Sequence, residues 1–141
     1  MANKVHDIIN RERKKRGLPH ISWSKELARL AQKQANYCAK VGRKVHSGRP
    51  AFYGGENLSG GKGDFSPRSI VNSWLKSQLG HREYLLSPEV TRAGVGTARR
   101  NGKMFVAWTF GRSIDEGRGW LVWLILALIL VVGFVIWNWL W

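Results

Sequence analysis

Apolar residues recur at helical spacing in three segments of the chain. In the first segment, Val5, Ile8 and Ile9 fall on one face of a helix whose other positions are mostly charged or polar. The second segment follows Ser24, a favourable N-cap, and stops at Gly42, a favourable C-terminal residue. The third opens with a Ser-Pro pair, which is typical of a helix start. The predicted helices cover residues 3–16, 25–41 and 67–78.

Strand-like patterns come after these helices. The runs 92–99 and 103–111 are joined by a turn that contains Asn101-Gly102, a strong hairpin signal. Residues 43–65 are rich in glycine and lack apolar periodicity, so they are expected to form an ordered loop with room for one short strand. Helices first and strands last, without βαβ alternation, predict an α+β sandwich.

The last 23 residues, GWLVWLILALILVVGFVIWNWLW, carry no charge. As a helix they would extend about 34 Å, compared with about 30 Å for the hydrocarbon core of a bilayer. Tryptophans flank both ends of the run, as in interfacial aromatic belts. The sequence therefore predicts a domain over residues 1–112, a linker over 113–119 and a transmembrane helix over 120–141.

The flanking charges predict how this single span is oriented. Arg112 and Arg118 precede it and no charge follows it, whereas the first residues, MANKVHDIINRERKKRG, contain no apolar run of the kind found in signal peptides. We therefore expect a tail-anchored protein whose amino-terminal domain is cytoplasmic. An extracytoplasmic domain, exported by another route, is the alternative.

The charge balance favours an anionic partner. The chain has 23 Lys and Arg against 9 Asp and Glu, a net charge of +14. A basic domain held at a membrane is attracted to anionic lipid headgroups, and nucleic acid attracts the same charge. No helix-turn-helix, zinc-finger or aromatic-platform signature is present to favour nucleic acid. The residues expected to meet lipid headgroups are Arg11, Arg13, Lys14, Lys15 and Arg16.

Five segments, in this order, resemble the CAP superfamily, which comprises the cysteine-rich secretory, antigen 5 and pathogenesis-related 1 (SCP-like) proteins, in its short microbial form. The segments are INRERKKRGLPHISWSKELARLAQKQA, the HS at His46, GGENLSGG, VNSWLKSQLGHREYLLSPEVTRAGVGTA and MFVAWTFG. The resemblance covers residues 5–110. It implies an α-β-α sandwich around a small antiparallel sheet, in agreement with the order of the predicted elements.

The resemblance also implies a cleft with two histidines and two acids that binds a divalent metal, typically Zn²⁺. His46 and His81 match the histidines and Glu56 matches the first acid, whereas Ser77 stands at the position of the second acid. Imidazole and carboxylate are ordinary zinc ligands. The supporting residues of this cleft are Asn57, Ser77 and Glu83.

Several interpretations of these residues remain open. The metal-ligand candidates either hold a metal or form a hydrogen-bonded network that pins the glycine-rich loop. Glu83 either replaces the missing acid or points away. Ser77 lies four residues before His81, but Gly80 is expected to break the helix that would bring them together. Two further histidines, His6 and His20, are expected at the surface.

Cys38, the only cysteine, is expected to be a small buried residue, with a reactive thiol or a metal ligand as the alternatives. For the chain as a whole, the sequence favours a non-enzymatic binding or assembly module at a membrane surface that binds lipid or metal. One alternative is a metal-dependent hydrolase that uses the His46, Glu56 and His81 cleft. The other is a membrane-held basic subunit that contacts nucleic acid or a larger assembly such as a virion.

Overall fold

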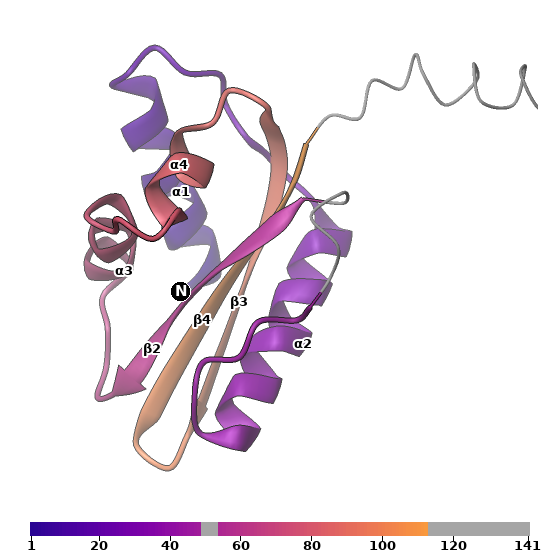
Figure 1. Cartoon of the computed structure of the whole chain (residues 1–141), viewed down its shortest axis with the longest axis vertical. Helices are drawn as coiled ribbons and strands as arrows, with labels where there is room; N and C mark the ends of the chain where they lie inside the picture. The colour runs from indigo at the N-terminus through magenta and orange to yellow at the C-terminus, as the bar shows by residue number, and fades with distance from the viewer. Residues whose placement is uncertain (49–53, 113–141) are drawn as a thin grey trace, which may run out of the picture.

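The computed structural model describes residues 1–48 and 54–112, which form three layers (Figure 1). A four-stranded sheet lies between one long helix on one face and three shorter helices on the other. The helices are α1 (Ala2–Lys14), α2 (Lys25–Val41), α3 (Pro67–Leu75) and α4 (His81–Leu86), and the strands are β1 (Ser22–Trp23), β2 (Gly55–Lys62), β3 (Val90–Arg100) and β4 (Lys103–Arg112).

The strands lie in the order β1-β3-β4-β2. β3 and β4 form the predicted hairpin, and both turn residues have positive φ, 51° at Asn101 and 68° at Gly102. Asparagine and glycine tolerate this left-handed conformation, which is why the pair specifies the turn. β2 pairs antiparallel with β4, and the short β1 pairs parallel with β3.

The helix boundaries follow the local signals in the sequence. The Ser24 hydroxyl accepts a hydrogen bond from the Leu27 backbone N–H at 3.2 Å, and Gly42 ends α2 with φ 73°, so this prediction is confirmed. α1 ends two residues earlier than predicted. α3 ends at Leu75, three residues early, because the backbone N–H of Ser77 turns to bond the carbonyl of residue 74.

The glycine-rich stretch 43–65 contains one strand, as the sequence allowed, but β2 is longer than the short strand expected. All eight residues of β2 pair with β4. A side chain at Gly55 would collide with the ring of Phe110, and one at Gly60 would collide with Phe105. The glycines therefore leave room for aromatic rings of the neighbouring strand, and pairing with an interior strand compensates for their low strand propensity.

Two apolar clusters fill the spaces between the layers, which confirms the α+β sandwich. One joins α1, α3 and α4 to the sheet and contains Trp74 and Trp108. The other lies under α2 and contains Cys38, which is buried as predicted. α2 lies directly on β3, since a side chain at Gly94 or Gly96 would collide with the α2 backbone.

Arg13 is fully buried, so its predicted placement on a lipid-facing surface is wrong. Its guanidinium donates to the carbonyls of Pro19 at 2.9 Å, Leu85 and Ser87 at 2.8 Å, and Val90 at 3.4 Å. These carbonyls come from the turn after α1, the end of α4 and the start of β3. The planar guanidinium, with five N–H donors, satisfies all of these segments at once.

His6 is also buried, which corrects its predicted surface position, whereas His20 is exposed. His6 Nε2 lies 3.1 Å from the Ile21 carbonyl oxygen, and Asn10 donates to the same oxygen at 3.0 Å. Burial lowers the pKa of His6, with a smaller effect in the same direction from the neighbouring His20. The imidazole therefore stays neutral in the folded domain at neutral pH.

Among residues 1–48 and 54–112, no helix is both long and apolar enough to cross a bilayer. The predicted linker 113–119 and the predicted span 120–141 lie outside the described residues. Their assignments therefore stay predictions from the sequence.

We expect Arg13→Met to lower the free energy of unfolding by about 3 kcal/mol or more, because it leaves several buried carbonyls without a donor. The matched control is Arg11→Met, at an exposed position of the same helix, which should change it by less than about 0.5 kcal/mol. Guanidinium unfolding of the wild-type and variant chains measures both values. Equal effects would contradict the structural role of Arg13.

We expect the folded domain to lose stability as the pH falls below the ordinary histidine value of about 6.5, because the unfolded chain then binds a proton that folded His6 does not. His6→Gln keeps a donor for the Ile21 carbonyl and removes this titration. The difference between wild type and variant should change by up to about 1.4 kcal/mol per pH unit between pH 6.5 and 5.5. Parallel pH profiles in unfolding titrations would refute the assignment.

Candidate functional site

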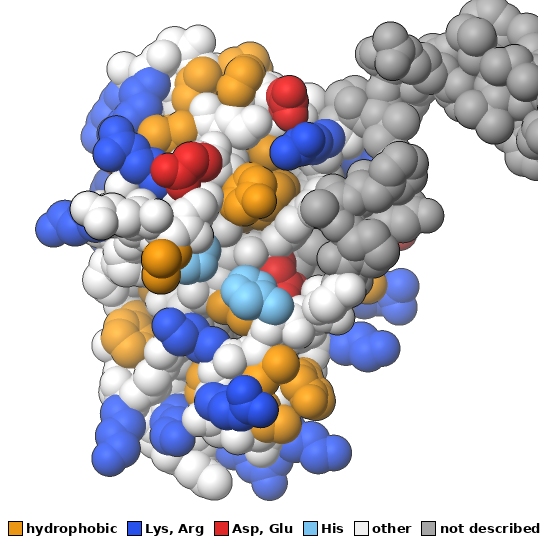
Figure 2. All heavy atoms as spheres, viewed as in Figure 1, with side chains coloured by type: hydrophobic (Ala, Val, Ile, Leu, Met, Phe, Trp, Pro, Cys, Tyr) orange, Lys and Arg blue, Asp and Glu red, His pale blue; other side chains and the backbone are white. Residues whose placement is uncertain are grey.

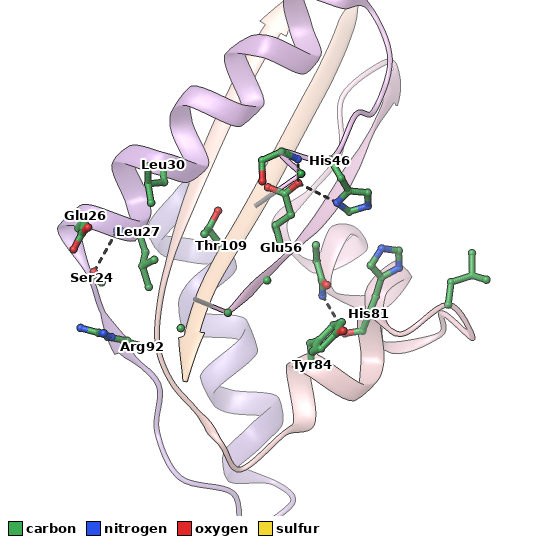
Figure 3. Close-up of a pocket in the computed structure, with 17 residues that line it drawn as sticks. Ser24, Glu26, Leu27, Leu30, His46, Glu56, His81, Tyr84, Arg92 and Thr109 are labelled. Atoms are coloured by element: carbon green, nitrogen blue, oxygen red, sulfur yellow. Dashed lines mark hydrogen bonds and ion pairs between the residues drawn. The ribbon is translucent and has the colours of Figure 1, made fainter. Parts of the chain in front are cut away.

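A cleft of about 500 Å³ opens between α2, the start of β2, the end of β4 and α4 (Figure 3). It contains all three residues that the sequence proposed as metal ligands. The polar part of its wall includes His46, Glu56, Asn57, His81 and Thr109, and the apolar part includes Leu27, Leu30, Leu79 and Tyr84.

Glu56 orients His46. Its carboxylate oxygen Oε1 lies 3.0 Å from His46 Nδ1 and accepts the Ser47 backbone N–H at 2.6 Å. The Glu56 side chain is 7% exposed, whereas that of His46 is 62% exposed. Because an ionised carboxylate only accepts hydrogen bonds, Nδ1 of His46 carries the proton. In the neutral ring, Nε2 of His46 is therefore left as an acceptor or a metal ligand.

His81 meets Ser77, contrary to the expectation that Gly80 would separate them. Ser77 Oγ lies 2.9 Å from His81 Nδ1, and it also accepts the Leu79 backbone N–H at 3.1 Å. The helix does break, but Gly80 adopts φ 86° and the turn returns the chain so that His81 begins α4 beside Ser77. The glycine therefore brings the pair together through a turn rather than a helix.

A hydroxyl fixes a histidine less firmly than a carboxylate does. Ser77 Oγ–H can donate to Nδ1 of His81 or accept a proton from it, so it permits both neutral tautomers. Only the tautomer protonated at Nδ1 leaves Nε2 free to bind a metal. Burial lowers the pKa of His81, and the nearby His46 and Lys44 lower it further, so the ring is neutral at pH 7.

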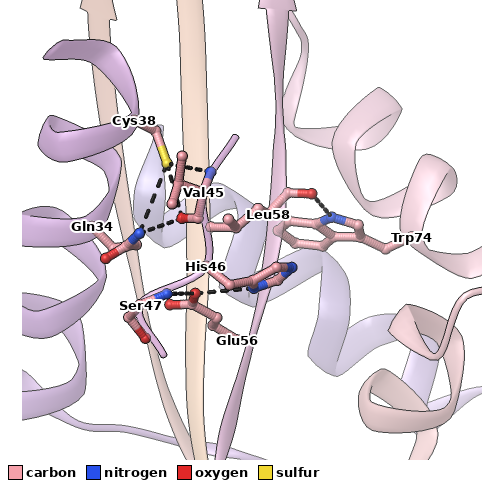
Figure 4. A network of polar contacts seen from close by, with 8 residues as sticks. All are labelled: Gln34, Cys38, Val45, His46, Ser47, Glu56, Leu58 and Trp74. Atoms are coloured by element: carbon pink, nitrogen blue, oxygen red, sulfur yellow. Dashed lines mark hydrogen bonds and ion pairs between the residues drawn. The ribbon is translucent and has the colours of Figure 1, made fainter. Parts of the chain in front are cut away.

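Two residues of α2 hold the segment that carries His46 (Figure 4). Gln34 donates from Nε2 to the Val45 carbonyl, and Cys38 Sγ lies 3.4 Å from both the carbonyl oxygen and the backbone nitrogen of Val45. Cys38 is thus a structural contact. Sequence reasoning missed Gln34, although its position on the inward stripe of α2 was a usable signal.

Three acceptor atoms of the cleft residues are buried without a hydrogen-bond partner among the described residues: Glu56 Oε2, Asn57 Oδ1 and Thr109 Oγ1. The Asn57 amide donates instead to the His81 carbonyl at 3.0 Å, as expected of a residue that bonds backbone. Buried acceptors without a donor are unfavourable. The cleft is therefore chemically suited to a ligand that donates hydrogen bonds or carries positive charge.

The residues fit zinc only in part. Within residues 1–48 and 54–112, no three His, Cys, Asp or Glu side chains converge as a metal-binding group. Glu83 is exposed and does not line the cleft, so it does not supply the missing acid. His46 and His81 are the residues that would hold a metal. Glu56 would orient His46 by accepting the hydrogen bond from its Nδ1.

Most cations of the basic segment 11–16, at the end of α1, interact with other groups of the domain. Glu12 lies 2.8 Å from Lys15, 2.9 Å from Arg16 and 3.0 Å from Arg68. Hydrogen bonds from Lys15 and Arg16 lower the pKa of Glu12 to about 2. With Arg13 buried, Arg11 and Lys14 are the cations of this segment without a salt bridge among the described residues.

Comparison with known proteins gives a family for most of the described chain. The model of the cysteine-rich secretory protein (CAP) family matches residues 6–111. Pathogenesis-related leaf protein 4 of Solanum lycopersicum is 31% identical over 119 residues, which cover 73% of this chain and 72% of that protein. The protein YkwD of Bacillus subtilis (strain 168) is 31% identical over 107 residues, which cover 66% of this chain and 40% of YkwD.

Solved structures agree in fold. An extracellular protein containing an SCP domain, from Bacillus anthracis str. Ames, superposes with a TM-score of 0.65 at 20% identity, over 79% of this chain and 40% of that one. An outer surface protein of Borrelia burgdorferi superposes with a TM-score of 0.57 at 19% identity, over 77% and 90% of the two chains. The three-layer fold, the cleft residues and the match over residues 6–111 show that this chain belongs to the CAP family.

Proposed function

We propose that this chain is a non-enzymatic binding module that takes a small ligand in the CAP cleft and works at a membrane surface. The observation that carries the proposal is the pair of buried acceptors, Glu56 Oε2 and Asn57 Oδ1, that have no donor among the described residues and lie in the same cleft as the imidazoles of His46 and His81. A ligand with N–H or O–H groups, or a cation, would satisfy them. The apolar wall at Leu30 and Tyr84 would cover the rest of such a ligand.

Zn²⁺ is the simplest cation that fits this chemistry. His46 and His81 would hold it through their Nε2 atoms, and water would complete four-coordinate geometry. When bound, the metal supplies positive charge that polarises an oxygen ligand. Ser77 lowers the affinity, because its hydroxyl does not enforce the tautomer of His81 that binds a metal.

The membrane part of the proposal rests on residues 120–141 and on the position of α1. Arg13 at the end of α1 bonds the carbonyl of Val90, and Val90 pairs with Arg112, the last residue of β4. The cations Arg11 and Lys14 therefore lie towards the end of the sheet from which the chain continues to the predicted span. Anionic headgroups would add roughly 1 kcal/mol for each such residue near the surface.

Hydrolysis in the same cleft, with His81 as a base rather than as a metal ligand, is the second candidate. The 2.9 Å contact between Ser77 and His81, together with the lowered pKa of His81, favours it, because a neutral imidazole can accept a proton at pH 7. Among the described residues, the His81 ring hydrogen-bonds only Ser77, so no third side chain bonds Nε2 and orients the ring. A binding role therefore accounts better for the cleft.

We expect the full-length chain, reconstituted in neutral-lipid nanodiscs, to bind Zn²⁺ in calorimetry. His46→Ala/His81→Ala should lose at least about 10-fold in affinity, since it removes both imidazoles. His20→Ala, an exposed histidine outside the cleft, is the matched control. Equal binding by the double variant would contradict a cleft metal site. Hydrolysis of ester or peptide substrates that disappears in His81→Ala would favour the second candidate instead.

Ser77→Glu should raise the Zn²⁺ affinity by about 10- to 100-fold, because a carboxylate forces the proton onto Nδ1 of His81 and strengthens Nε2 as a ligand. Ser77→Gln has a similar size and no charge, and should raise it little. The same calorimetric titration at pH 7 measures both variants. A Glu variant that binds no better than wild type would show that Ser77 does not limit the site.

A further inference from the structure

The outer face of α2 carries cations that have no acidic partner among the described residues. Lys25, Arg29 and Lys33 follow one another at a spacing of four residues, and Lys40 continues the exposed face about two turns later. Like charges four residues apart destabilise a helix. Lys25 also lies in the first turn, where the helix dipole disfavours positive charge. Helix stability therefore does not explain this arrangement.

A second set of cations lies at the hairpin end of the sheet. Lys103 is directly opposite Arg100 on one neighbouring strand and directly opposite Lys62 on the other. Like charges in register across strands are unfavourable. Lys103 Nζ also donates to the Gly42 carbonyl at 2.9 Å, so this row adjoins the end of α2 and the exposed Arg43.

Together these residues are called here the basic track, which also has one exposed acid beside it, Glu26 in the first turn of α2. Within the described part of the chain none of them forms a salt bridge. Asp64, the acid nearest the hairpin, is paired with Arg99 at 3.0 Å. Figure 2 shows Lys and Arg along the side and the lower end of the molecule, where Figure 1 places α2 and the hairpin. The basic track consists of Lys25, Arg29, Lys33, Lys40, Arg43, Lys62, Arg100 and Lys103.

The shape of the basic track favours a linear polyanion. From Lys25 to Lys40 it extends about 22 Å along one straight helix. The apolar face of α2, with Ala31 and Ala35, is packed on the sheet, so the helix has no apolar face to insert into a bilayer. Tyr37 is the one exposed aromatic residue on the described part of this helix, whereas single-strand binders stack successive bases on several aromatics.

We propose that the basic track binds the phosphate backbone of double-stranded nucleic acid, without regard to base sequence. Such binding uses no residue of the cleft and so goes beyond the proposed function. The hairpin end of the basic track lies at the opposite end of the sheet from Arg112, where the chain continues towards the predicted span. The other end of the basic track, at Lys25, lies near the end of β4, because Leu27 of the same helical turn approaches Gly111. A duplex along the whole basic track would therefore run from the hairpin towards the end of the sheet at Arg112.

The test uses the full chain in neutral-lipid nanodiscs and a fluorescent 20-base-pair duplex of random sequence, followed by anisotropy. With about six phosphate contacts, the affinity should fall by about 10³-fold between 50 and 200 mM salt. In Lys33→Glu/Lys40→Glu/Arg100→Glu the salt slope should be shallower by about 2.7, and the affinity at 50 mM salt lower by on the order of 100-fold.

The matched control, Lys4→Glu/Arg11→Glu/Lys14→Glu, makes the same change of charge on α1 and should retain affinity within about threefold. Circular dichroism of both variants verifies that the fold persists. Equal loss in the two variants, no binding of duplex at 50 mM salt, or tighter binding of a single strand would each overturn the proposal. Phosphatidylserine vesicles that bind the basic track more tightly than the duplex does would overturn it in favour of a bilayer contact.

Discussion

The guanidinium of Arg13 links the parts of the domain on which the cleft depends. It is buried without an acidic partner among the described residues and bonds carbonyls at the end of α4 and the start of β3. His81 begins α4, so the helix that presents this imidazole is fixed at its other end by a residue of α1. Without this guanidinium, each of these carbonyls would lose its hydrogen bond while remaining buried. α1 therefore supports the cleft from a distance, although none of its residues lines the cleft.

Local signals made much of this fold predictable. Ser24 and Gly42 act within one turn of their own helix, and Asn101-Gly102 acts within four residues, so their effect depends little on the rest of the chain. β2 was not predictable in this way. Its glycines are required by the rings of Phe105 and Phe110, which are more than 40 residues distant in sequence, and no property of the segment itself reveals them.

The candidate site was likewise predictable only in part. The resemblance of motifs identified His46, Glu56 and His81, and the fold brings them to one cleft. The contact of Ser77 with His81 was not foreseen, because it depends on a left-handed glycine that reverses the chain rather than on helical spacing. For Arg13 the spacing was a usable signal, since it lies four residues after Ile9 on the inward stripe of α1, but the carbonyls that it bonds come from distant segments and could not be foreseen.

Burial and ion pairing of individual cations change how the net charge of +14 is interpreted. The cations of RERKKR are the most conspicuous in the sequence, yet one is buried and two share the single negative charge of Glu12. Lys25, Arg29 and Lys33 of α2 are spread along the sequence at four-residue intervals and come onto one face only when the helix forms. Charge density along the chain therefore overstates what this segment can offer a partner, because attraction to a partner depends on charges left unpaired on one face. The two proposals accordingly assign the two anionic partners expected from composition to different helices, lipid headgroups to α1 and nucleic acid to α2.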